Sequence, residues 1–181
     1  MSALGKAIVS LLLTASICLL PCSYLPINQP AQAATTIYVD ASATGANVGT
    51  SWQDAFTSLQ PALAAALTGD DIWVAAGTYK PGNNRAATFQ LISGVEIYGG
   101  FPVGGGDFAS RDPELNPTVL SGDIGTPSNN ADNSYHVVTG SGTDNTALLD
   151  GFVVSDGNSN STSPNDRGGG LYNDIGSPII T

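Results

Sequence analysis

The chain is poor in cysteine. Both cysteines, Cys18 and Cys22, lie in the segment 1–33, so residues 34–181 contain none. A segment without cysteine forms no disulfide, and it must be stabilised by buried apolar surface or by bound ions. It also offers no thiol nucleophile.

Positive charge is scarce as well. The chain carries 5 Lys and Arg against 15 Asp and Glu. Lys6 lies near the N-terminus, so residues 34–181 hold four cations against all fifteen acidic side chains, a formal net charge of −11. Such a balance excludes nucleic acid and anionic membrane surfaces as favoured partners, because both require basic patches.

Histidine occurs once, as His136 in the short run 135–138. No serine or cysteine nucleophile motif accompanies it, so we interpret His136 as a structural or surface residue. We predict no catalytic residue and no cofactor-binding residue, and we identify no cofactor.

Residues 1–33 have the pattern of a secretory signal peptide. Lys6 precedes an apolar stretch over 7–20, and the small residues Ala31 and Ala33 flank Gln32 at the expected cleavage site. The alternative, a membrane anchor, is disfavoured because the stretch is shorter than the roughly 20 residues that span a bilayer. The sequence therefore predicts export, with a secreted, extracellular or outer-membrane location.

Long helical patterns are missing, and short β-rich runs take their place. After 36–39, runs lie at 72–76, 95–98, 118–120, 135–138, 152–154 and 178–180. Glycines follow several of them, as sharp bends require. From 72–76 onward the run centres are regularly spaced, at roughly 21 residues on average, which predicts one strand-bearing coil per interval of a repeated solenoid. Longer insertions are expected at 102–117 and 155–170. The last run reaches the chain end without a cap, so we expect either that another subunit covers this end or that further coils follow Thr181, and we favour further coils.

One amphipathic helix is expected before these runs. Trp52, Phe56, Leu59, Leu63 and Leu67 share one helical face. Ser51 and Asp54 fit an N-terminal capping box, Gly69 fits the stop, and Pro61 predicts a kink or two short helices. We expect this segment to cover the end of the solenoid core rather than to bind a partner.

The runs with their flanking residues carry a family resemblance. Segments 71–79, 95–101 and 118–123 resemble the opening coils of secreted right-handed parallel β-helix proteins of the pectate-lyase-like superfamily. Segments 133–138, 149–154 and 168–173 are similar to its bacterial surface members, the last also to repeats of polymorphic outer-membrane proteins. The resemblance implies a right-handed parallel β-helix whose N-terminal end is blocked.

The same superfamily includes polysaccharide-cleaving enzymes, so the resemblance leaves enzyme and adhesin open. Its lyases typically combine an arginine base with calcium-binding aspartates. Arg85, Arg111 and Arg167 fall in expected loops here, so no catalytic residue is transferred.

Carboxylates near strand ends can be interpreted either as a metal site or as turn residues. Asp123, Asp150 and Asp156 recur at strand ends, and oxygen ligands of this kind suit calcium. We favour ordinary turn chemistry for them, and likewise for the pair Asp70 and Asp71 after Gly69. The metal site is therefore left unknown, with calcium as the candidate ion, and no spacing singles out an acid and base pair.

Aromatic residues have two interpretations. Trp52 and Phe56 fit the buried helix face. Trp73, Tyr79, Tyr98 and Phe101 fit either a carbohydrate-stacking surface or packing against the insertions, and we favour packing.

Together these features predict an all-β chain: a signal peptide at 1–33, a strand and capping helix at 34–70, and a right-handed parallel β-helix at 71–181, truncated at its C-terminal end. The leading hypothesis is an exported, non-catalytic surface protein with a polysaccharide or cell-surface partner. Membrane association is expected only through sequence beyond Thr181. The alternative hypothesis is a polysaccharide lyase or glycoside hydrolase.

Overall fold

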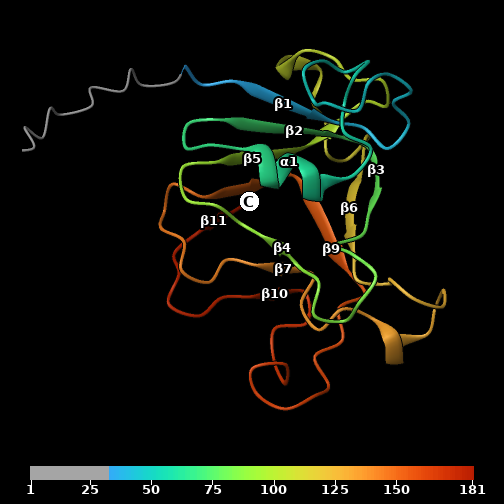
Figure 1. Cartoon of the computed structure of the whole chain (residues 1–181), viewed down its shortest axis with the longest axis vertical. Helices are drawn as coiled ribbons and strands as arrows, with labels where there is room; N and C mark the ends of the chain where they lie inside the picture. The colour runs from blue at the N-terminus through green and yellow to red at the C-terminus, as the bar shows by residue number, and fades with distance from the viewer. Residues whose placement is uncertain (1–32) are drawn as a thin grey trace, which may run out of the picture. The chain divides into compact units, whose positions relative to one another are not determined.

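The computed structural model describes residues 33–181 (Figure 1). The predicted signal peptide lies almost entirely outside this range and stays a prediction. The strands are β1 (Thr36–Val39), β2 (Asp71–Ala75), β3 (Gly77–Tyr79), β4 (Phe89–Gln90), β5 (Glu96–Phe101), β6 (Thr118–Ser121), β7 (Val138–Thr139), β8 (Leu148–Asp150), β9 (Phe152–Ser155), β10 (Leu171–Tyr172) and β11 (Ile179–Ile180). The helical segments are α1 (Leu59–Ala65) and the 3-10 turns η1 (Phe108–Ser110) and η2 (Asn130–Asp132).

All strand pairs between these elements are parallel, and they form three sheets. The first sheet has the order β1-β2-β5-β8-β11, the second β3-β6-β9 and the third β4-β7-β10. In Figure 1 the strands β4, β7 and β10 lie one below another. The predicted all-β class is confirmed.

The chain visits the three sheets in one fixed order. The strands β2, β3 and β4 belong to the first, second and third sheet, and the same order returns in β5 to β7 and in β8 to β10. Successive strands of the first sheet begin at Asp71, Glu96, Leu148 and Ile179. We call the stretch from one strand of the first sheet to the next a circuit, and these circuits differ in length. The predicted coil of uniform length, with one β-rich run in each coil, is therefore wrong. Neighbouring β-rich runs mostly belong to different sheets.

Apolar residues in register on the first sheet belong to the main hydrophobic cluster. Ile37, Ile72, Ile97 and Leu149 pair across β1, β2, β5 and β8, and all four are buried. Alternation along each strand sends these side chains inward and their neighbours outward. Ile180 continues the column on β11, yet it is 46 % exposed. The core is therefore covered at β1, whereas Ile180 on β11 is partly exposed.

Of the two short helices that Pro61 predicts within 52–67, only the second forms. Ser51 Oγ and the amide of Asp54 do bond at 3.1 Å, as a capping box requires, but no helix follows. The reason is that this segment pairs with the edge of β1: Phe56 N donates to Tyr38 O and Asp40 N to Phe56 O, both at 2.9 Å. Helical structure begins only at Leu59, and Pro61 lies in its first turn.

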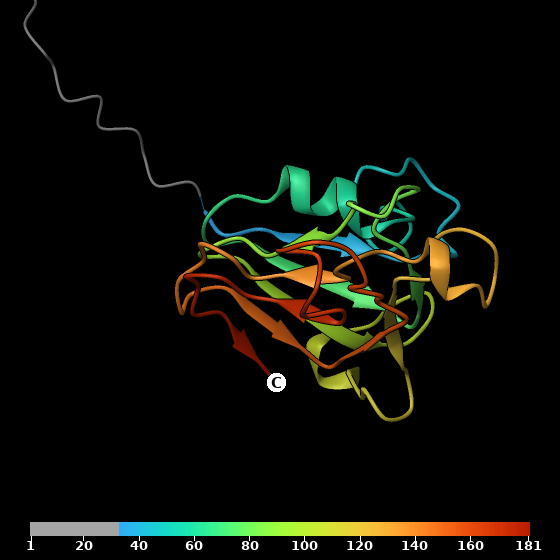
Figure 2. The same ribbon diagram turned by 90° about the horizontal axis from the view of Figure 1, so that it is seen from below.

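The remaining helix does cover the core. Its buried residues Leu59, Ala62 and Leu63 belong to the main hydrophobic cluster, while Leu67 is 51 % exposed beyond the helix end. In Figure 2 the helix α1 lies alongside β1. The end of the first sheet at β1 is thus closed by α1 and by the segment before it.

The segments 102–117 and 156–170 connect strands of different sheets, as expected for insertions. A third long connection, 122–137 between β6 and β7, was not predicted, because the run 135–138 becomes a strand only at Val138. Among residues 33–181 we find no helix with the length and hydropathy of a membrane span.

Candidate functional site

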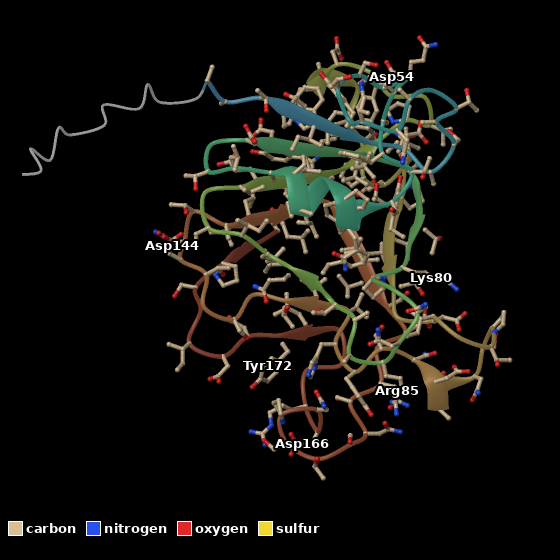
Figure 3. All side chains as sticks on the ribbon, viewed as in Figure 1. Asp54, Lys80, Arg85, Asp144, Asp166 and Tyr172 are labelled. Carbon is tan, nitrogen blue, oxygen red and sulfur yellow. The ribbon has the colours of Figure 1, made fainter. Side chains whose placement is uncertain are left out.

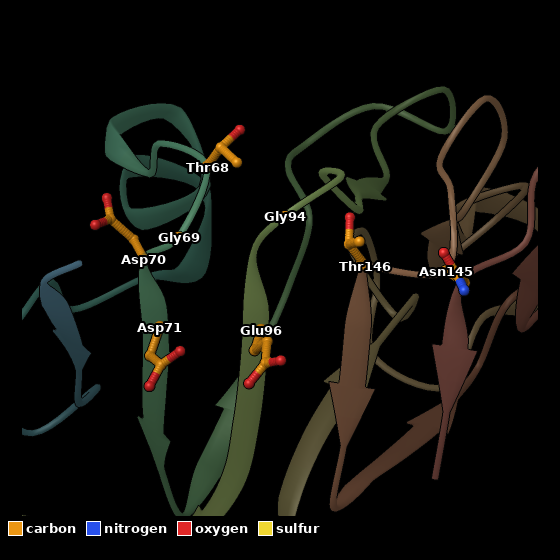
Figure 4. A pocket seen from close by; sticks show the side chains of 8 residues that line it. All are labelled: Thr68, Gly69, Asp70, Asp71, Gly94, Glu96, Asn145 and Thr146. Carbon is orange, nitrogen blue, oxygen red and sulfur yellow. The ribbon is translucent and has the colours of Figure 1, made fainter. Parts of the chain in front are cut away.

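An acidic pocket lies where β2, β5 and β8 begin (Figure 4). Its volume is about 480 Å³. The lining residues are Thr68, Gly69, Asp70, Asp71, Gly94, Glu96, Asn145 and Thr146. Residues from three successive circuits therefore meet in one hollow, which we call the acidic pocket.

Two carboxylates of the acidic pocket face each other across neighbouring strands. Asp71 of β2 and Glu96 of β5 are register partners, and Figure 4 shows them side by side on the two strands. Burial and then the charge of Glu96 raise the pKa of Asp71. A proton is therefore held more firmly on Asp71 than on an isolated aspartate.

Tyr98 extends this pair along β5. Its hydroxyl donates to Glu96 Oε2 at 2.5 Å. Burial, followed by this hydrogen bond, raises the pKa of Tyr98 to about 12. The phenol stays protonated at neutral pH, so it serves Glu96 as a hydrogen-bond donor.

Asp70 has a structural role, unlike the neighbouring pair of Asp71 and Glu96. Only 4 % of the residue is exposed, and its carboxylate accepts hydrogen bonds of 2.9 Å from Thr35 N, Thr35 Oγ1 and Leu67 N. Burial acts to raise the pKa of Asp70, but these bonds hold it below its ordinary value. Asp70 thus ties the start of β1 to the turn before β2, in keeping with a turn role. Asp71 instead faces the pocket.

An aromatic cluster covers the outer face of the first sheet next to the acidic pocket. Trp73 stacks on Phe101 at 4.9 Å between ring centroids, and Phe108 of the 102–117 insertion lies 5.4 Å from Trp73. Trp52 contacts Phe101 at 5.3 Å and donates from Nε1 to the carbonyl of Gly106 at 2.9 Å. These rings pack against the insertion, which leaves no open stacking surface at Phe101, a fully buried residue.

A bulge in β5 makes this packing possible. Trp73 pairs with Tyr98, but Ala75 pairs with Phe101, so β5 has one extra residue in this interval. Gly100 within it has φ +89°, a conformation that glycine adopts without strain. The extra residue turns Phe101 to the same face as Tyr98.

Arg111 fastens the insertion to the sheet. Its guanidinium forms an ion pair with Asp150 and donates from Nε to the carbonyl of Gly99. It also lies 5.4 Å from the ring centroid of Tyr98. Arg111 is therefore occupied by structural contacts.

The calcium candidates are not brought together. Asp150 pairs with Arg111, whereas Asp156 accepts hydrogen bonds from Ser121 Oγ at 2.9 Å and Ser155 Oγ at 2.6 Å. Asp123 Oδ2 accepts from the amide of Ser128. Across residues 33–181, no three His, Cys, Asp or Glu side chains are grouped as a metal site would need.

A second polar centre joins three connecting segments, and its importance was not visible in the sequence. Arg85 donates to Asn133 O at 2.7 Å, Asn158 O at 2.9 Å and Asn160 Oδ1 at 2.6 Å. Its guanidinium also lies 4.1 Å above the ring of Tyr135. We call this arrangement the Arg85 anchor. Figure 3 shows Arg85, with Tyr172 and Asp166, in the lower part of the molecule.

The other residues that the sequence singled out make structural contacts. Tyr79 is buried, and its hydroxyl donates to Ala75 O at 3.0 Å and accepts from Ala41 N at 3.2 Å. Arg167 pairs with its neighbour Asp166 in an exposed stretch. His136 is buried beside the 156–170 insertion, where both ring nitrogens have partners.

No family model matches the chain, and searches of curated proteins and of solved structures return no match.

Proposed function

We propose that the chain forms part of an exported right-handed parallel β-helix that contacts carbohydrate without cleaving it. The observation that carries this proposal is the acidic pocket, because it gathers polar side chains from three successive circuits on one face. The fixed order of the three parallel sheets supports the β-helix. Parallel crossover connections are right-handed in nearly all proteins, which supports the handedness.

The lining of the pocket determines the class of sugar. Asp71 and Glu96 accept hydrogen bonds from hydroxyl or ammonium groups, and Asn145 and Thr146 both donate and accept. The net charge of the chain repels anionic polymers, so a neutral or amino sugar is favoured over a uronate. The volume of about 480 Å³ lies in the range of small-ligand sites.

The contacts of the arginines support a non-catalytic role. Arg111 is held by Asp150 and Gly99, and Arg85 by three oxygen atoms of other segments. An arginine that acts as a base must be free to approach the substrate. These two are engaged in holding connecting segments.

Binding is tested by calorimetric titration of the purified chain with neutral, amino and uronic oligosaccharides, followed by product analysis. We expect neutral or amino oligosaccharides to bind, and to be recovered intact. Glu96→Gln should weaken binding of an amino sugar about tenfold, the loss of one charge-assisted bond. Glu114→Gln, which removes an equal charge from the exposed 102–117 insertion, is the matched control and should bind normally. Failure of all three classes to bind would refute the proposal.

One observation favours glycoside hydrolysis as a second candidate function. Asp71 and Glu96 lie in register on neighbouring strands, the pKa of Asp71 is raised, and a pair of carboxyl groups is what hydrolases use. Release of reducing ends from a neutral polysaccharide, abolished in both Asp71→Asn and Glu96→Gln, would establish this activity. Intact oligosaccharides after prolonged incubation would exclude it for the polymers tested.

A further inference from the structure

His136 joins the segment before β7 to the far end of the 156–170 insertion. The residue is 9 % exposed, and its ring stacks on Tyr172 at 4.7 Å with an interplanar angle of 24°. Nδ1 lies 3.0 Å from the carbonyl oxygen of Gly168, and Nε2 lies 3.2 Å from Asn165 Oδ1. Both ring nitrogens therefore face oxygen atoms of the insertion.

This arrangement requires one ring proton and links a second one to the orientation of Asn165. The carbonyl of Gly168 can only accept, so Nδ1 carries a proton. In a neutral imidazole Nε2 then has a lone pair, which an amide oxygen repels. The contact is satisfied either when Nε2 is also protonated, or when the Asn165 amide turns and donates from its nitrogen. Protonation of His136 and the orientation of Asn165 are thus coupled.

We propose that His136 and Asn165 form a pH-dependent latch that holds residues 165–168 against the start of β7. The imidazolium donates two charge-assisted hydrogen bonds, which are stronger than those of the neutral ring. The latch is closed when both ring nitrogens carry a proton, and it is weaker when Nε2 is unprotonated. This inference does not depend on the function proposed for the acidic pocket.

The charged and titratable residues around His136 have other partners, so His136 is the residue that we assign to the latch. Asp166 and Arg167 lie between the two contact residues and pair with each other at 2.8 Å. Tyr172 of β10 supplies the stacked ring. On the other side, Tyr135 is covered by the Arg85 guanidinium, which is charged at every pH of interest.

The Arg85 anchor provides an internal reference. It holds Asn158 and Asn160 at the near end of the same insertion through a group that does not titrate. The near end at 158–160 should therefore be held equally at all pH values, and only the far end at 165–168 should respond.

Amide hydrogen exchange of the full chain at pH 5.5 and 8.0, corrected for the intrinsic rate at each pH, tests the latch. We expect peptides over 165–170 to exchange about tenfold more slowly at pH 5.5. Peptides over 156–161 should change less than about twofold, because the Arg85 guanidinium keeps its charge. Asn165→Ala keeps the backbone and the Gly168 bond but removes the partner of Nε2, so it should abolish most of the difference.

Two results would overturn the proposal. One is equal protection of 165–170 at both pH values in the unmodified chain. The other is a pH difference that persists in Asn165→Ala but disappears in Asp166→Asn, because the titrating group would then be Asp166. The expected behaviour of Asp166→Asn is an unchanged pH difference.

Discussion

The paired carboxylates of the acidic pocket should lower stability at neutral pH, and Asp71→Asn should relieve this cost. Neighbouring strands lie about 4.8 Å apart, and two charges at about 5 Å repel by roughly 1 to 3 kcal/mol between the dielectric limits of water and a protein surface. Glu96 is exposed and Asp71 is only partly buried, so solvent screening reduces this to about 0.5–1 kcal/mol. The corresponding rise in Tm is about 1–4 °C for a domain of this size.

The direction of the pKa shift determines the pH at which Asp71→Asn is more stable than the unmodified chain. The pKa of Asp71 in the folded chain lies above its ordinary value of 3.8. Protonated Asp71 therefore favours the folded state: this contribution is fully present below pH 3.8 and is lost as the pH rises through the raised pKa. Above that raised pKa the unmodified chain has lost it. The advantage of Asp71→Asn should accordingly be present at pH 7 and absent at pH 3.5.

Urea denaturation at both pH values provides the assay. Glu96→Gln should be stabilised less than Asp71→Asn, because it removes the repulsion but not the burial of the Asp71 charge. Once Asp71 is neutral, the second substitution should add little. Glu114→Gln controls for the general effect of removing one negative charge. An equal gain in Glu114→Gln and Asp71→Asn, or a gain at pH 3.5, would refute the reasoning.

Three further predictions concern packing. Leu149→Ala should cost about 2–5 kcal/mol in urea denaturation, whereas Ile180→Ala, in the same inward column but 46 % exposed, should cost less than about 1 kcal/mol; equal costs would contradict the partial exposure of Ile180. Arg85→Ala and Arg85→Lys should both expose 158–160 to limited proteolysis, because lysine does not reproduce the guanidinium fork; protection in the lysine variant would contradict this. Tyr79→Phe should cost about 1–3 kcal/mol by thermal unfolding, since two main-chain contacts are lost, one of them buried. An unchanged Tm would argue against those contacts.

The longer strands could be predicted from local patterns. The runs 36–39, 72–76, 95–98 and 118–120 alternate or cluster β-branched residues, and each coincides with a strand of the structure. The strands β4, β7 and β10 contain two residues each, which is too short for any periodicity. The pairing of these three strands depends on the neighbouring circuits, so no local sequence pattern predicts them.

The part of the predicted helical segment before Leu59 does not form, for a related reason. The spacing of Trp52, Phe56 and Leu59 fits a helix, but the backbone of Phe56 bonds to Tyr38 and Asp40 instead. The edge of β1 offers partners that a local pattern does not contain. Tertiary pairing thus overrides the helical periodicity of this segment.

The acidic pocket could not be predicted from the sequence, because it depends on the register between strands. Asp71 and Glu96 are distant in the sequence, and only the pairing of β2 with β5 brings them together. The shorter circuit that the spacing of the β-rich runs indicates would place other residues beside Asp71. The Arg85 anchor was hidden likewise, because its partners come from two distant connections.

The stacking order of the circuits is tested most directly by disulfide formation along one outward row. Thr78, Val119 and Val153 are register partners on β3, β6 and β9. In a full chain with Cys18 and Cys22 replaced by serine, cysteine pairs at 78/119 and at 119/153 should cross-link under mild oxidation, since adjacent strands lie about 4.8 Å apart. The pair 78/153 spans two strand spacings, about 9.6 Å, and should stay reduced. Efficient cross-linking of 78/153, or none at 119/153, would contradict the order of circuits on which the account rests.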